Sequence, residues 1–232
     1  MEGTGNGLAR LPGGTRAGLG LLLAGALALG SGACSMSPFS IRGSGVAASE
    51  ERTVGGFQRL SIGGSARVHI TVGPPVSLRI RTDDNLLPHV ITEVEGDTLK
   101  VHMESGSYNF RLPLEVTLSV PDLHGFSVSG SARAQITGLH GGEFSVSTSG
   151  SSRVQADGTV DRLKVGISGS GSLDLHGVEA QQASVRVSGS GSVKLQVREE
   201  LEARISGSGN LRYGGRPRVS AHISGSGSIT PE

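Results

Sequence analysis

Apolar and polar residues alternate along much of the chain, most regularly after residue 126. Between residues 185 and 197 the odd positions hold Val, Leu or Gly, and the even positions hold Arg, Ser, Lys or Gln. The same alternation runs through 126–136 and 163–175. A period of two places one kind of side chain on each face of an extended strand. The pattern therefore predicts β-strands that bury one face only.

A Ser-Gly-centred unit recurs with successive steps of 20, 19, 20, 18 and 18 residues. Its shared glycines are Gly130, Gly150, Gly169, Gly189, Gly207 and Gly225. An earlier copy is centred on Gly64, because residues 60–71 align with residues 126–137. A fixed period near 19 residues is typical of stacked repeat architectures. Glycine allows the backbone angles of a sharp bend, so we expect structural turns at these positions.

Each unit is interpreted as a strand, a tight Ser-Gly-Ser-Gly corner and a second strand. Polar stretches at 137–143, 157–162 and 214–218 would supply the return turns. Stacked units can pair their backbones and bury one continuous apolar interior, which a single unit cannot do. We therefore predict an all-β, single-stranded β-helix or β-solenoid with rungs of about 19 residues. An antiparallel meander with a hairpin turn at each Ser-Gly pair stays open, since it would alternate in the same way.

The chain divides into four predicted parts. Residues 1–33 are expected to be an export signal peptide, and residues 34–52, rich in Ser, Gly and charge, a flexible tether. Residues 53–232 form the predicted solenoid domain, with irregular rungs over 53–125 and regular repeats over 126–232. Within the irregular part, four longer segments alternate and are separated by turn signals. These segments are 76–82, 89–95, 98–104 and 114–120.

The N-terminal segment has the layout of a bacterial export signal. Arg10 and Arg16 precede an apolar run over 19–29, which is short for a membrane span. Cys34, the one cysteine of the chain, follows Gly32-Ala33 and resembles the lipobox cysteine of bacterial lipoproteins, although Ser31 occupies the usual Leu position. We expect lipidation at Cys34 and a membrane partner through that lipid, which places the protein at the outer membrane or cell surface. Ordinary secretion is the alternative.

Composition and motifs argue against several functions. The net charge is +1, aromatic residues make up 3% of the chain and no basic block is present, so we expect no nucleic-acid partner. No Ser lies in a hydrolase-type nucleophile motif, and no pair of acids recurs at matched positions of neighbouring units. The chain is therefore expected to be non-enzymatic and without a cofactor. A polysaccharide-binding or polysaccharide-active β-helix, with acids converging on one groove, is the alternative.

Histidine and serine recur at regular places in the units. His124, His140 and His176 each follow a Leu and precede a Gly, but their spacing does not follow the rung period, so we expect exposed turn histidines and no metal site. Two Ser rows are expected to stack on the surface and could bind a glycan or a protein partner, and ice binding is a weaker interpretation of the same rows. The rows are Ser168, Ser188, Ser206 and Ser224, and Ser170, Ser190, Ser208 and Ser226.

The order of these segments resembles a known family over roughly residues 53–229. An early Phe57-x-x-Leu60-x-Ile62-x-Gly64 strand is followed by a Gly-Asp-Thr-Leu-Lys-Val strand at 96–101, by 116–123 and by the Ser-Gly-Ser-Gly repeats. This combination resembles the bacterial "putative auto-transporter adhesin, head GIN domain" family. The resemblance implies a pectin-lyase-like β-helix, an envelope location and a role in adhesion, and it brings no catalytic residues.

The last predicted rung, 219–229, has no recognisable polar cap. A solenoid end without a cap presents free strand edges that can pair with another chain. We therefore expect a homo-oligomer formed by self-association.

Overall fold

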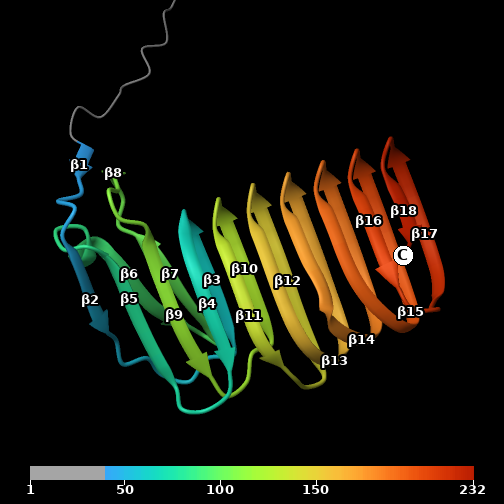
Figure 1. The fold of residues 1–232 in the computed structure, drawn as a ribbon, viewed down its shortest axis with the longest axis horizontal. Helices are drawn as coiled ribbons and strands as arrows, with labels where there is room; N and C mark the ends of the chain where they lie inside the picture. The colour runs from blue at the N-terminus through green and yellow to red at the C-terminus, as the bar shows by residue number, and fades with distance from the viewer. Residues whose placement is uncertain (1–39) are drawn as a thin grey trace, which may run out of the picture. The chain divides into compact units, whose positions relative to one another are not determined.

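The computed structural model describes residues 40–232, which form one β-solenoid (Figure 1). Most of the strands alternate between buried and exposed side chains, as the period of two predicts. A short 3-10 helix, η1, spans Leu87–His89. The strands are β1 (Ser40–Arg42), β2 (Ala47–Glu51), β3 (Arg59–Gly64), β4 (Ala66–Val72), β5 (Ser77–Asp83), β6 (Val90–Glu95), β7 (Thr98–Met103), β8 (Ser107–Asn109), β9 (Leu114–Val120), β10 (Gly125–Gly130), β11 (Arg133–Leu139), β12 (Glu143–Gly150), β13 (Arg153–Gly169), β14 (Ser172–Gly189), β15 (Ser192–Gly207), β16 (Asn210–Gly214), β17 (Arg218–Gly225) and β18 (Ser228–Pro231).

The repeats build two facing layers of parallel strands. Layer I contains β3, β10, β12, the second halves of β13, β14 and β15, and β17. Layer II contains β4, β11, the first halves of β13, β14 and β15, and then β16 and β18. An antiparallel meander would require antiparallel neighbours, whereas every pair between successive rungs is parallel. The prediction of a β-solenoid is therefore confirmed.

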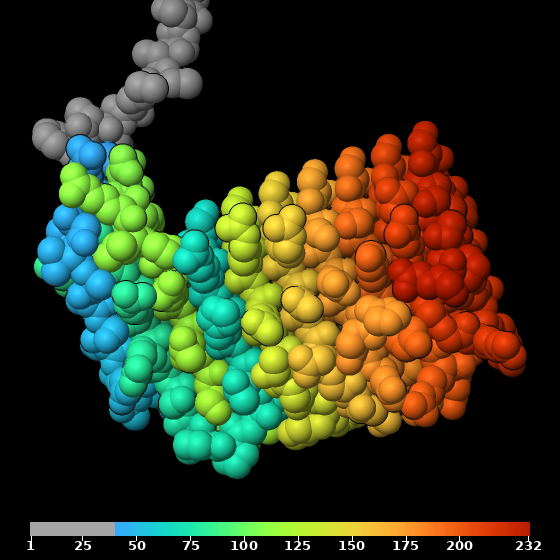
Figure 2. All heavy atoms as spheres, viewed as in Figure 1, coloured from blue at the N-terminus to red at the C-terminus, as the bar shows by residue number. Residues whose placement is uncertain are grey.

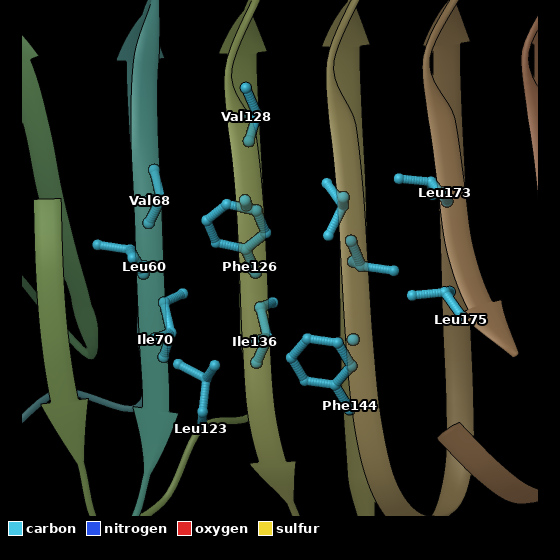
Figure 3. Packing of buried hydrophobic residues seen from close by; sticks show 14 of the residues in the cluster. Leu60, Val68, Ile70, Leu123, Phe126, Val128, Ile136, Phe144, Leu173 and Leu175 are labelled. Atoms are coloured by element: carbon cyan, nitrogen blue, oxygen red, sulfur yellow. The ribbon is translucent and has the colours of Figure 1, made fainter. Parts of the chain in front are cut away.

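Apolar side chains from both layers fill the interior (Figure 3). Leu60 and Phe126 of layer I lie in register, and so do Val68 and Ala134 of layer II. All four are at most 7% exposed. Burying each large apolar side chain contributes about 1.5–3 kcal/mol, so stacked rungs offset an ordering cost that one rung could not.

The corner between the two layers is built on a ladder of glycines. The corner glycines adopt φ angles from +88° at Gly64 to +134° at Gly130. A Cβ at Gly150 would overlap the carbonyl oxygen of Gly130 on the preceding rung. The next residue continues the pairing, because Ser151 donates its backbone N–H to that carbonyl at 3.1 Å and Ser170 donates to Gly150 at 2.9 Å. Only glycine combines this backbone conformation with so close an approach.

The return bends lie within the predicted turn stretches but differ in local form. Residues 140–142 form a short connection between β11 and β12, within the predicted 137–143 turn. The predicted turn at 157–162, however, lies inside the continuous strand β13, which bends at Gly158 with φ +135° and shifts register beside it. The chain therefore returns between the layers within the predicted stretch, but through a bulged strand that keeps its backbone pairing.

Residues 53–125 are arranged differently from a simple run of irregular rungs. The segment 59–72 forms a regular rung that stacks directly on β10 and β11. The strands β5, β6, β7 and β9 lie on the opposite side of that rung, where β7 pairs with β3 and β9 with β4. Two antiparallel pairs, β5 with β9 and β6 with β7, close this end. The inserted strands therefore cover the N-terminal end of the stack.

The ordered structure begins earlier than the predicted boundary at residue 53. Strand β2 pairs antiparallel with β5, and β1 pairs with β8. The guanidinium of Arg52 donates to the carbonyl of Val90 at 2.6 Å and to the hydroxyl of Thr92 at 3.1 Å. A flexible tether over all of 34–52 is therefore wrong for residues 40–52, because strand pairing satisfies their backbone groups.

Asp83 fastens this N-terminal segment to the cap. Its carboxylate is fully buried and accepts backbone N–H groups from Gly45 at 2.7 Å and from Arg111 and Leu112 at 3.0 Å. Burial would raise the pKa of Asp83, but these hydrogen bonds and the charge of Arg111 lower it below 3.8. The carboxylate thus joins three chain segments.

Cys34 and the predicted signal peptide, residues 1–33, lie outside the described residues. Within residues 40–232, no helix has the length and apolar character needed to cross a membrane.

Candidate functional site

The outer face of layer I carries a row of serines that the rung register aligns. These residues are Ser129, Ser149, Ser168, Ser188, Ser206 and Ser224. Neighbouring strands are about 4.8 Å apart, so the hydroxyls repeat at that interval along the solenoid axis. The structure thus brings the first predicted Ser row together and extends it to β10 and β12.

A second aligned row lies two residues earlier on the same face. Its members are Ser61, Ser127, Ser147, Gly166, Arg186, Arg204 and His222. Because most of these side chains are small, the two rows border an open groove of about 780 Å³ that runs from β3 to β17. We call it the serine groove. Its lining within the described chain contains no Asp or Glu, and its basic side chains lie toward the C-terminal rungs.

The second predicted Ser row lies elsewhere. Ser170, Ser190 and Ser208 occupy the exposed corner between the layers, and none of them lines the serine groove. Their backbone N–H groups donate to the glycine carbonyls of the preceding rung at 2.9 Å. The corner serines therefore continue the backbone ladder and do not share one flat surface with the first row. Figure 2 shows how closely successive rungs follow one another along the stack.

The outer face of layer II holds an arginine patch that the sequence interpretation missed. Arg67, Arg133 and Arg153 stand in register on β4, β11 and β13. His69, Gln135 and Gln155 form the next aligned row. All six side chains are exposed. The signal is visible as a shared Ser-x-Arg-x-His/Gln at 65–69, 131–135 and 151–155.

Carboxylates gather in a different, smaller hollow of about 280 Å³ on layer I. Glu200 and Glu202 lie two residues apart on β15 within it, and Glu202 pairs with Arg204 at 2.6 Å. Beside the hollow, Glu143 accepts a hydrogen bond from Lys164 at 2.8 Å. That bond, assisted by Arg162, lowers the pKa of Glu143 although burial opposes it. A carboxylate with a lowered pKa is a poor proton donor near neutral pH.

The three corner histidines are dispersed. His124 lies 2.8 Å from the carboxylate of Asp122, and His176 lies 3.3 Å from that of Glu232. His140 is exposed. Among residues 40–232 no three His, Cys, Asp or Glu side chains are grouped so as to hold a metal ion.

Known proteins resemble this chain mainly in fold. The crystal structure of a "putative adhesin" from Bacteroides fragilis aligns with a TM-score of 0.68 at 21% identity, covering 83% of this chain and all of that one. A "putative lipid binding protein" from Parabacteroides distasonis aligns with a TM-score of 0.54 at 24% identity, covering 84% of this chain and all of that one. No curated protein matches.

A family match covers most of the solenoid. The family described as "putative auto-transporter adhesin, head GIN domain" matches residues 56–217, which include the groove-forming strands β3, β10 and β12 and all three arginines of the patch. The predicted resemblance is thereby confirmed, and the chain belongs to the head GIN domain family.

Proposed function

We propose that this protein is a non-catalytic binding module of the cell envelope that holds an extended ligand in the serine groove. The observation that carries the proposal is the groove itself, which crosses the aligned rungs from β3 to β17. It is lined by hydroxyls, glycine and a few basic side chains, and also by the aliphatic residues Val128, Ile167, Val187 and Ile205. An open, regular channel of this kind suits a chain-like ligand such as a glycan. Serine hydroxyls can both donate and accept hydrogen bonds to sugar hydroxyls.

The proposed location rests on two different supports. Membership of an adhesin-like family indicates a cell-surface or envelope protein. The lone Cys34 after Gly32-Ala33 supports a lipid anchor, which would hold the solenoid at the outer membrane or cell surface. Intact-mass measurement of the protein from its native membrane fraction tests the anchor. A mature chain that starts at an acylated Cys34, and loses the added mass in Cys34→Ala, is expected; an unmodified soluble chain would contradict it.

Filling the groove tests the binding function. Ser149→Trp and Ser168→Trp would each place an indole over the central rungs of the groove. The assay is binding to an array of bacterial polysaccharides. For a ligand that crosses these rungs, we expect the affinity to fall about tenfold or more. Ser192→Trp is the matched control, because Ser192 is exposed on the outer face of layer II. Unchanged binding in both groove variants would disprove the role of the groove.

A polysaccharide-active β-helix remains the alternative function. Glu200 and Glu202 share a hollow, but they lie on one strand and Glu202 already pairs with Arg204. A glycosidase requires two carboxyl groups that flank the scissile bond. Release of reducing ends from the bound polysaccharide, abolished in Glu200→Gln or Glu202→Gln, would establish the enzyme and refute the proposal of a binding module.

A further inference from the structure

We propose that the arginine patch on layer II is a second binding site, which takes an acidic polysaccharide lying along the solenoid axis. The patch consists of Arg67, Arg133 and Arg153 with His69, Gln135 and Gln155. It lies on the outer face of layer II, whereas the serine groove lies on that of layer I. The proposal therefore goes beyond the proposed function and does not depend on the groove.

The arginines are close neighbours in space although Arg67 and Arg133 are 66 positions apart in sequence. Arg67 pairs in register with Arg133, and Arg133 with Arg153, on three adjacent strands. Their Cα atoms therefore repeat at about 4.8 Å along the axis. This arrangement presents a line of guanidinium groups to any ligand that runs along the stack.

The positive charge of this line is only partly balanced by the protein. Glu115 on β9 lies 3.6 Å from Arg67 and 2.9 Å from Arg81. Neither Arg133 nor Arg153 forms an ion pair within residues 40–232. Asp174 borders the patch from β14, where it is the register partner of Gln155. Like charges directly opposite each other on neighbouring strands are destabilising, so an external anion would relieve the repulsion between Arg133 and Arg153.

The fold does not require arginine at these positions. The equivalent residues of the later rungs are Ser172, Ser192, Asn210 and Ser228, which continue the same row in register. Those rungs keep the same backbone pairing with small polar side chains. The arginines are thus confined to three rungs of the stack and can be replaced by serine without changing the architecture.

The chemistry of the patch favours an acidic glycan over other polyanions. A guanidinium binds carboxylate or sulfate through two parallel hydrogen bonds, and the adjoining Gln and His side chains can hydrogen-bond sugar hydroxyls. The intervening apolar side chains, such as Val68 and Ala134, are buried, so the patch offers no anchor for lipid tails. It contains no aromatic ring for stacking nucleobases other than the imidazole of His69.

Binding of defined polymers to the full-length protein tests this site. The probes are polygalacturonate and dextran sulfate, with neutral dextran, phosphatidylglycerol vesicles and duplex DNA for comparison. We expect the two acidic polysaccharides to bind, with affinity falling as salt rises, and neutral dextran to bind far more weakly through this face. Arg133→Ser combined with Arg153→Ser should weaken acidic-polysaccharide binding about tenfold or more, since two charge-assisted contacts are lost.

Three further variants separate the patch from general charge effects. Arg212→Ser removes an exposed arginine from β16 on the same face. This variant should bind the acidic polysaccharides with an affinity within about twofold of that of wild type. Glu115→Gln removes the carboxylate that competes for Arg67 and should tighten binding about twofold or more. Arg133→Lys with Arg153→Lys keeps the charge but loses the planar fork, so an intermediate affinity is expected.

Opposite results would overturn the proposal. Wild-type affinity in the Arg133→Ser, Arg153→Ser protein would exclude the patch as the site. Binding of vesicles or DNA without binding of either acidic polysaccharide would show that the patch recognises a different polyanion. Loss of binding only in Ser149→Trp or Ser168→Trp would assign these polysaccharides to the serine groove instead.

Discussion

At the scale of single residues, the backbone role of a glycine depends on its place in the rung. Gly150 is a corner residue with φ +117°, and a Cβ there would overlap the backbone of Gly130. Gly166 lies on the outer face of β13, where a Cβ would meet only the Cβ of Ser147 at 3.7 Å. The same residue type is thus indispensable at one position and replaceable at the other.

Alanine substitution should separate these two glycines. Gly150→Ala is expected to lower the free energy of unfolding by about 1–3 kcal/mol or more, because it combines an unfavourable φ with a steric overlap. Gly166→Ala should change it by less than about 1 kcal/mol, or raise it slightly, since alanine fits an extended strand. Urea unfolding of both variants measures the difference. Equal destabilisation would show that the corner geometry is not the cause.

At the scale of elements, the cap formed by β5, β6, β7, β9 and η1 covers one end of the stack. Asp83 connects this cap to Gly45 and to residues 111–112. The carboxylate stabilises the fold most while it is ionised, because its partners are N–H donors and a protonated carboxyl group accepts them more weakly. Its folded pKa is lowered, so the unfolded chain binds the proton more readily. This contribution to stability is therefore present above pH 3.8 and is lost as the pH falls below that value.

Asp83→Asn should test this connection. We expect the variant to be about 1–3 kcal/mol less stable than wild type near pH 6, because an amide accepts these N–H groups less strongly. The gap should narrow as the pH falls below the ordinary carboxyl pKa of 3.8, because the unfolded wild-type chain then takes up a proton more readily than the folded protein, in which the pKa of Asp83 is lowered. Thermal unfolding from pH 6 to pH 2.5 measures the difference in stability between the variant and wild type. Asp161→Asn, at an exposed position, is the control. A gap that is independent of pH would contradict the role of the ionised carboxylate.

At the scale of the whole molecule, the two ends of the described stack differ. The cap covers the rung of β3 and β4, whereas β17 pairs only with β15 and β18 only with β16. The apolar residues of β17 continue the interior columns of β15 in register, but no further rung of the described chain covers them, and Val219 and Ile223 are 38% and 41% exposed. Backbone groups on an unpaired strand edge favour pairing with another strand.

Self-association through β17 and β18 is therefore our proposal for the oligomeric state. Light scattering across a wide concentration range should show a mass that rises above that of the monomer. Ile223→Glu should raise the dissociation constant of the oligomer about tenfold or more, because association would bury a charge at the strand edge. Val94→Glu is the control, since Val94 is 38% exposed on β6 at the capped end. A monomer at all concentrations would refute the proposal.

The sequence alone determined the half-buried strands and the positions of the bends. It did so through the alternation around Val185 and Val187 and the period of the corner glycines. These features are local: a period of two specifies a half-buried strand, and a repeated glycine marks the bend. The arrangement of strands around the Ser-Gly corners was also predictable, and so was the family. Parallel pairing could not be separated from antiparallel pairing, because both place the same residues inside.

Only the tertiary structure decided which distant segments meet. It placed β5, β6, β7 and β9 over the end of the stack, joined residues 40–52 to that cap through Asp83 and Arg52, and aligned Arg67 with Arg133 and Arg153. Strand register and stacking order depend on which strand edges remain free after the core has packed, and no short sequence window contains that information. The candidate surfaces follow from this non-local register, since each requires side chains from successive rungs to stand side by side.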